Sequence, residues 1–221
     1  MRTTGRLARV QALSGLAFAF FLGLHLTTTA SGIAGPAAYD GTLALLRRVY
    51  RPTLAIEALL IGVPLIVHVA CAIVQIAARR RDRSRPTAPL AHRLAGYVLL
   101  AAIGGHVLAT RVMPAFGGGP ADFSYLAYSL LNWPAFMRPY YLVLAAAGAV
   151  HLVLGLGIAL RVLGVARPSD RTLRLAAAAA ALLVFLGTAS IHAQAPTADR
   201  ARFPEFRALY NRFLPFMPTR F

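Results

Sequence analysis

The chain of 221 residues has no lysine, a single cysteine and only seven acidic residues. One cysteine excludes a disulfide scaffold, and because Cys71 lies in an apolar run it does not indicate a redox compartment. Charged residues make up 14% of the chain, well below the roughly one quarter typical of soluble domains. A hydrophobic content of 58% excludes a disordered chain. Nothing resembles a hydrolase triad, a phosphate-binding loop or a zinc site.

The positive charge is carried by arginine alone, and the formal net charge is +16. The arginines lie between long apolar runs rather than in one patch, which argues against nucleic acid as a partner. Basic residues in such positions are typical of the flanks of membrane spans. The mean hydropathy of +0.62 also favours a membrane protein in contact with a lipid bilayer.

Five apolar runs are long enough to cross a bilayer, which takes roughly 20 residues. They cover residues 10–30, 53–78, 91–113, 140–161 and 173–194. We therefore expect an all-α integral membrane protein, with a five-helix transmembrane domain over residues 1–194.

The remaining residues, 195–221, form a C-terminal tail rich in arginine and aromatic side chains. Such a segment can lie on the lipid surface or cover a partner. It can equally be a solvated tail with local packing. Three prolines, Pro204, Pro215 and Pro218, argue against one long helix.

The distribution of arginines predicts that the N-terminus lies inside. The N-terminal segment and the connections at 79–93 and 161–174 hold thirteen arginines, against five in the other two connections. By the positive-inside rule, the richer side faces the cytoplasm or matrix. We expect a bacterial plasma membrane or a mitochondrial inner membrane, and the sequence leaves the choice between them open.

The sequence contains an internal repeat of two helices. A glycine precedes a histidine by ten residues in the first and third runs, namely Gly15 before His25 and Gly96 before His106. The second and fourth runs each hold a histidine with an arginine about ten residues later. Runs one and two therefore look like a copy of runs three and four, with a fifth helix added.

Four of the six histidines lie inside predicted spans, one in each of the first four: His25, His68, His106 and His151. At a rise of about 1.5 Å per residue, His25 and His106 lie in the outer half of the membrane. His68 lies in the inner half, and His151 lies between the middle and the inner side. Facing imidazoles in a helix bundle are ligands for a cofactor, and two on one haem iron suit electron transfer. The pattern predicts two bis-histidine b-type haems stacked across the membrane.

Residues one turn away from these histidines fit a flat porphyrin. Gly148 and Gly155 flank His151, and Thr29 and Thr110 each follow a histidine by four residues. The hydroxyls can orient the rings or bind haem carboxylates. The alternative is that small residues only allow close helix packing and that the histidines are structural hydrogen-bonding residues.

Arginines near the span ends are candidates for pairing with haem carboxylates, because a guanidinium binds a carboxylate through two parallel hydrogen bonds. Arg9, Arg93 and Arg161 are the inner candidates, and Arg51 and Arg111 the outer ones. The alternative for each is anchoring at the membrane interface.

Three further polar residues have open roles. Glu57, the only acid within a span, can carry protons or pair with Arg51 or Arg111. His92 lies at the inner interface, where it can simply face water. For His192, near the end of the fifth run, we expect solvation or helix capping.

The chain resembles the cytochrome b membrane subunit of succinate dehydrogenases and fumarate reductases, in its five-helix, two-haem form. The resemblance covers about residues 1–194. It rests on Ser14-Gly15 leading to His25, Pro64 to His68, His92 to Gly96 leading to His106, and His151 with Gly155. It implies haem pairing of His25 with His106 and of His68 with His151. It also implies a flavoprotein and an iron–sulfur subunit as partners, and electron exchange with a membrane quinone.

A second resemblance is to fungal mitochondrial membrane proteins of lipid homeostasis, which have a similar anchor-like fold. It rests on the Arg47 to Pro52 run, on Glu57 and on His92 to Tyr97. This family implies no redox partner and instead a role in lipid homeostasis or as an adaptor. A third option is a haem subunit of a hydrogenase or formate dehydrogenase, which we rank lower.

Overall fold

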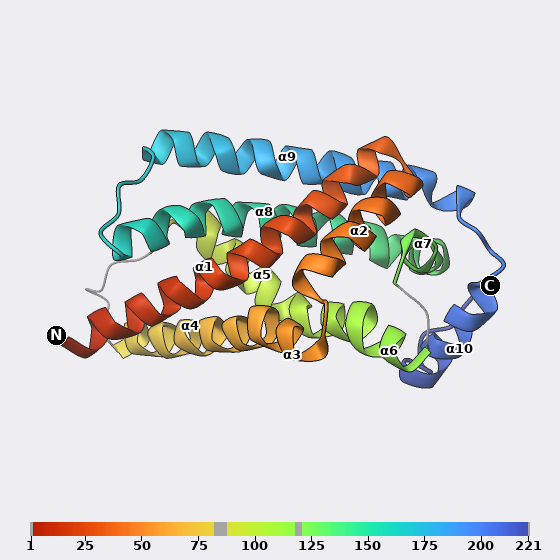
Figure 1. Cartoon of the computed structure of the whole chain (residues 1–221), viewed down its shortest axis with the longest axis horizontal. Helices are drawn as coiled ribbons and strands as arrows, with labels where there is room; N and C mark the ends of the chain where they lie inside the picture. The colour runs from red at the N-terminus through yellow and green to blue at the C-terminus, as the bar shows by residue number, and fades with distance from the viewer. Residues whose placement is uncertain (1, 82–87, 118–120, 221) are drawn as a thin grey trace.

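The computed structural model describes residues 2–81, 88–117 and 121–220. Part of the arginine-rich connection that predicts the orientation, residues 82–87, lies outside the described residues. Every regular element in the described part is a helix, and the helices form a long bundle (Figure 1).

Five helical segments of the described residues are long and apolar enough to cross a membrane, which confirms the five long apolar helices that the sequence predicts. They are α1 (Arg2–Ser31), α3–η2–α4 (Leu54–Glu57, Ala58–Gly62, Val63–Arg81), α5–η3–α6 (Leu90–Val107, Leu108–Val112, Met113–Gly117), α8 (Pro134–Val162) and α9 (Asp170–Gln194). The elements η2 and η3 are single π turns inside otherwise continuous helices. Such turns are rare and frequently occur at functional sites.

Shorter helices gather at the end of the bundle opposite the N-terminus. They are η1 (Gly32–Ala34), α2 (Pro36–Tyr50), α7 (Phe123–Asn132), η4 (Ala195–Thr197) and α10 (Phe203–Phe213). We call this the capped end and the opposite end the N-end (Figure 1). Most of the long connection between the third and fourth spans is therefore helical.

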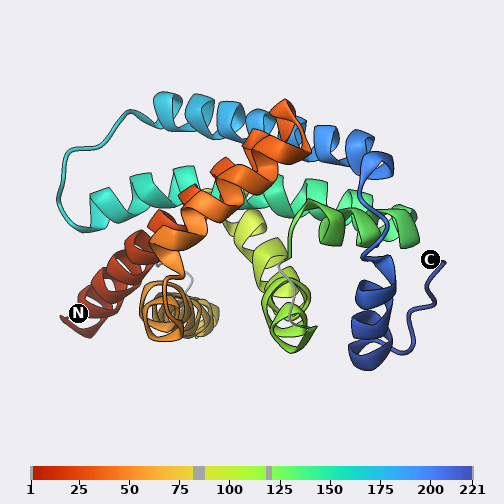
Figure 2. The same ribbon diagram turned by 45° about the vertical axis from the view of Figure 1, so that its right-hand side comes forward.

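The spanning helices pack in the order α4–α1–α8–α5, and α9 covers α8 and α1 from outside (Figure 2). Glycines allow close contact with α9. A β-carbon at Gly187 would overlap the backbone of Thr29, and one at Gly157 would overlap Leu173. Small residues at helix interfaces are typical of membrane bundles.

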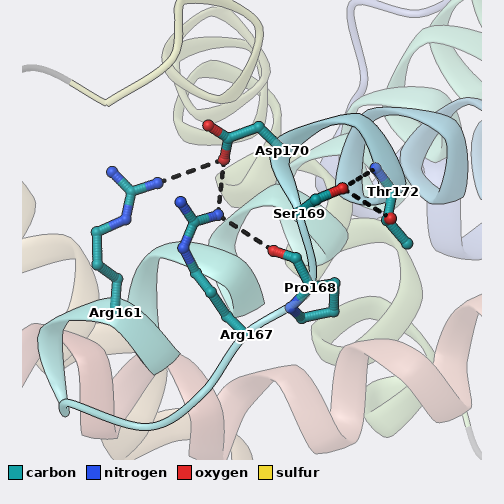
Figure 3. Close-up of polar contacts among 6 residues, drawn as sticks. All are labelled: Arg161, Arg167, Pro168, Ser169, Asp170 and Thr172. Carbon is teal, nitrogen blue, oxygen red and sulfur yellow. Dashed lines mark hydrogen bonds and ion pairs between the residues drawn. The ribbon is translucent and has the colours of Figure 1, made fainter.

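The start of α9 is fixed by side-chain capping at the N-end (Figure 3). Ser169 Oγ accepts a hydrogen bond from the Thr172 amide at 3.1 Å. Asp170 accepts one from Arg167 at 2.6 Å, and its charge suits the positive end of the helix dipole. The other arginine beside Asp170 is Arg161, at 3.5 Å.

The largest buried core lies at the capped end rather than among the spanning helices. Its aromatic members come from α7 and α10 and their flanks: Phe123, Tyr125, Tyr128, Phe203, Phe206 and Tyr210. The C-terminal tail thus packs locally on α6 and α7, and Pro204 stands in the first turn of α10, where proline is tolerated. An ion pair between Arg202 and Asp122, the N-cap of α7, joins the two helices.

Candidate functional site

A cavity of about 1280 Å³ lies between α1, α4, α5 and α8. Its volume exceeds the range of about 300–1,000 Å³ for pockets that hold one small ligand. All four of the histidines predicted within the first four spans line it. The interior of the spanning bundle is therefore a hollow lined by imidazoles and apolar side chains.

The histidines meet in the two pairs that the depth argument predicts. The ring centroids of His25 and His106 are 5.8 Å apart, and the ring planes make an angle of 66°. For His68 and His151 the distance is 6.1 Å and the angle 88°. We call the first the capped-end pair and the second the N-end pair. Each pair takes one histidine from the first two spans and one from the next two.

Both rings of the N-end pair are held by backbone carbonyls. His68 Nδ1 lies 3.2 Å from the Gln11 oxygen, and His151 Nδ1 lies 3.2 Å from the His92 oxygen. A carbonyl only accepts, so each Nδ1 carries the proton and donates it. The lone pair then resides on Nε2. In this tautomer Nε2 is the ring nitrogen that can bind a metal.

A glycine makes each of these hydrogen bonds possible. Gly15 stands four residues after Gln11, and Gly96 four residues after His92, so each lies one turn beyond the accepting carbonyl. A β-carbon at Gly15 would lie 2.9 Å from His68 Nδ1. One at Gly96 would lie 3.1 Å from the His151 ring. The absence of a side chain thus leaves room for the imidazole beside the helix.

The two halves differ in the residue that supplies the carbonyl. The His92 ring stacks on the His151 ring, with centroids 4.1 Å apart and planes 15° apart. In the other half, the Gln11 side chain instead accepts a hydrogen bond from Gln75. Gly155 lies beside His92, where a β-carbon would be 3.2 Å from Nε2. His92 thus lines the cavity and packs against His151, and Gly155 leaves room for the His92 ring.

The capped-end pair has a different environment. Among the described residues, His106 Nδ1 is buried without a hydrogen-bond partner. Phe21 stacks against the His25 ring at 5.6 Å. Thr110 lines the cavity and donates its hydroxyl to the His106 backbone carbonyl at 2.7 Å, the i−4 bond that threonine commonly makes in a helix. Thr29 also lines the cavity.

An ion-pair cluster lies next to the capped-end pair. Arg111 binds Glu57 through two hydrogen bonds, Nε to Oε1 at 2.7 Å and Nη2 to Oε2 at 2.8 Å. Arg51 Nε lies 3.2 Å from the same Oε1. The pairing alternative for Glu57 is therefore what the structure contains. Burial lowers the pKa of the Arg51 guanidinium, Glu57 opposes this, and the charge of Arg111 lowers it further.

The other predicted site residues divide into two groups. Arg93, Arg161 and Gly148 line the cavity. Arg9 is exposed on α1 and is not among the lining residues. Ser14 is not a lining residue either, but its hydroxyl donates to the Gln11 carbonyl at 3.1 Å. It thus contacts the group that holds His68.

Sequence reasoning missed two features of the site. The Gln11 carbonyl leaves no signature except its four-residue spacing to Gly15. His192 is buried and lines the cavity, and its Nε2 has no partner among the described residues, so the expected solvation is wrong. The packing of α9 against α1 and α8 places it there.

The described residues contain no group of three or more histidine, cysteine, aspartate or glutamate side chains that could hold a bare metal ion. A haem iron requires only two, because the porphyrin supplies the other four nitrogens. With an iron–nitrogen bond of about 2 Å and a ring centroid about 1 Å beyond the nitrogen, two axial rings have centroids roughly 6 Å apart. Both pairs have this separation, and neither is stacked face to face. The ring separation in each pair therefore fits two imidazoles on one haem iron.

Comparisons with protein-family models, with curated proteins and with solved structures find no match to this chain.

Proposed function

We propose that the chain is a membrane subunit that binds two b-type haems and transfers electrons across a bilayer. His25 and His106 would hold one haem, and His68 and His151 the other. The observation that carries the proposal is the N-end pair, in which both Nδ1 atoms donate to carbonyls at 3.2 Å and leave Nε2 as the free lone pair. Purely structural histidines would not need this arrangement in both halves beside one cavity.

The haems would supply reversible one-electron chemistry, and bis-histidine ligation would leave no open position on either iron. The protein's residues hold and orient the ligands. Gln11 and His92 fix the ring tautomers through their carbonyls, and Gly15 and Gly96 admit the rings. Two layers of ligands at different depths would then provide a path through the membrane.

The resemblance to succinate dehydrogenase and fumarate reductase cytochrome b subunits supports a place in such a complex. In this role the chain would pass electrons between an iron–sulfur partner subunit, next to a flavoprotein, and membrane quinone. It would not catalyse a reaction alone. The two halves of the bundle would descend from a duplicated helix pair, with the N-terminus inside a bacterial plasma membrane or mitochondrial inner membrane.

The test is a reduced-minus-oxidised absorbance spectrum of the purified chain, with haem quantified per chain. We expect about two b-type haems. His106→Ala and His68→Ala should each reduce this to about one. His192→Gln is the matched control, because it removes a buried imidazole that faces no other histidine across the cavity. A folded, haem-free protein would contradict the proposal, as would equal losses in all three variants.

A second candidate is a non-redox role in lipid homeostasis or as an adaptor, as the resemblance to the fungal proteins suggests. The apolar wall of the cavity favours it, since residues such as Leu16, Leu22 and Leu65 suit an acyl chain as well as a porphyrin. Haem-free protein that co-purifies with lipid, but without flavin or iron–sulfur subunits, would support this role instead.

A further inference from the structure

A second, smaller cavity of about 240 Å³ lies at the capped end, beside the large one. Three of the residues that line it are arginines: Arg47 from the end of α2, Arg51 just after α2, and Arg111 in the π turn η3. Segments far apart in the sequence thus bring three guanidinium groups to one pocket. The histidine pairs can bind haem iron without these three arginines.

The pocket has more positive charge than its neighbours balance. Glu57 binds both Arg111 and Arg51 with a single carboxylate. Of the other acids nearby, Asp40 accepts from the Phe123 amide at 2.8 Å and also attracts Arg47, whereas Asp122 pairs with Arg202. Glu57 and Asp40 together balance two of the three guanidinium charges, and a bound anion would complement the positive charge that remains.

Arg47 presents an unused donor. Its Nη2 donates to the Ala121 carbonyl at 3.1 Å, which fixes the position of the guanidinium. Its Nε is buried and has no hydrogen-bond partner among the described residues. A buried donor without an acceptor is costly, and a tetrahedral oxyanion in the pocket would supply one.

The pocket also lies at the edge of the membrane-spanning region. The second span begins at Leu54, three residues after Arg51. Leu54 and Ile56 are exposed apolar side chains at this edge. A group at this depth can reach the arginines from the aqueous phase or from a lipid headgroup.

We propose that Arg47, Arg51 and Arg111 form a binding site for a phosphate group, held as free phosphate or as a phosphomonoester headgroup. Guanidinium groups bind phosphate through paired hydrogen bonds, and phosphate carries close to two negative charges at neutral pH. Thr110 also lines the pocket and bonds to the His106 carbonyl, so the site adjoins the capped-end pair.

The test measures the thermal unfolding midpoint of the purified full-length chain as isolated, with its haem content recorded. Inorganic phosphate is compared with potassium chloride at equal ionic strength, and nanodiscs with phosphatidic acid are compared with phosphatidylcholine alone. We expect phosphate at tenfold its dissociation constant to raise the midpoint by about 3–6 °C. Arg51→Gln and Arg47→Gln should abolish the rise, whereas Arg48→Gln, which removes an exposed charge from the same helix, should keep it.

If Arg47→Gln fails to fold, Arg51→Gln together with ³¹P NMR line broadening of added phosphate provides the same test. A rise with both ligands supports the site, and a rise with phosphatidic acid alone supports it and assigns the headgroup as the source. No rise with either ligand would overturn it, and so would an equal loss in Arg48→Gln. A rise restricted to haem-free protein would also overturn it, because the arginines would then serve haem carboxylates. Haem content itself tests the separate proposal of electron transfer.

Discussion

The two histidine pairs have nearly the same ring separation but are held in different ways. In the N-end pair, each ring donates to a main-chain carbonyl, and a glycine makes room for it. In the capped-end pair, His106 Nδ1 has no partner among the described residues. The surroundings are arginines, an acid and the buried aromatic core of α7 and α10, which we call the cap. The comparison indicates that the N-end rings are held in place by the backbone, whereas the capped-end rings depend on the packing and charges around them.

The largest effect should come from filling the space that the glycines leave. Gly15→Val places a side chain where even a β-carbon would be 2.9 Å from His68 Nδ1. We expect it to displace this ring and reduce the haem content from two to about one, with the N-end haem lost. Haem quantification and the difference spectrum measure this. Gly23→Val in the same helix is the control, because nothing lies within 4 Å of its β-carbon position. Full haem content in Gly15→Val would contradict the backbone account of the N-end pair.

The cap should matter next, and for the other pair. Phe206 is buried, and its ring lies 5.1 Å from that of Tyr125, which lines the large cavity. Phe206→Ala should cost about 3 kcal/mol and lower the unfolding midpoint by roughly 6–12 °C. Phe216→Ala, at a ring that is 76% exposed, should leave the midpoint unchanged. If the cap supports only the capped-end pair, haem loss on heating Phe206→Ala should begin with that haem. Loss of the N-end haem first would reverse the assignment.

An intermediate effect is expected at Glu57, which joins Arg51 and Arg111. Glu57→Gln leaves both arginines without their carboxylate in a partly buried place, and should destabilise the fold by about 1–2 kcal/mol. The same change should strengthen phosphate binding at the arginine pocket, because the competing anion is gone. Asp170→Asn is the control, since its ion pairs are solvent-exposed. If both substitutions lower the unfolding midpoint equally, Glu57 contributes no more to stability than an exposed ion pair does.

The smallest effect should be a pH dependence at Asp40, in the cap. Burial raises the pKa of this carboxyl, and the Asp122 charge adds to the shift, although the Phe123 amide and two arginines oppose it. The folded chain therefore binds this proton more tightly than the unfolded chain, so stability falls as pH rises from the unfolded pKa through the folded one. Asp40→Asn retains an acceptor for the amide and should stabilise the fold at pH 7 by less than about 1 kcal/mol. The gain should vanish near pH 3, and a pH-independent gain would contradict this account.

The sequence predicts the five spans and the two histidine pairs because length, apolar content and depth along a helix are local properties. It does not predict the cap. The prolines and arginines in residues 195–221 hide an amphipathic helix whose apolar face becomes evident only against α7. Depth alone makes Arg9 a candidate for pairing with a haem carboxylate, but Arg9 lies on the exposed face of α1. The carbonyls that hold His68 and His151 belong to the main chain, which carries no residue type to recognise.

That use of the main chain has a consequence for how freely the chain can change. The acceptors for the N-end rings come from a glutamine in one half and a histidine in the other, and the two rings are held at the same distance. Positions 11 and 92 are therefore open to substitution as far as the carbonyl is concerned, while positions 15 and 96 tolerate glycine best. A tolerant position and a restricted one are thus separated by one helical turn, and a scan of side chains alone would overlook the main-chain groups that hold the rings.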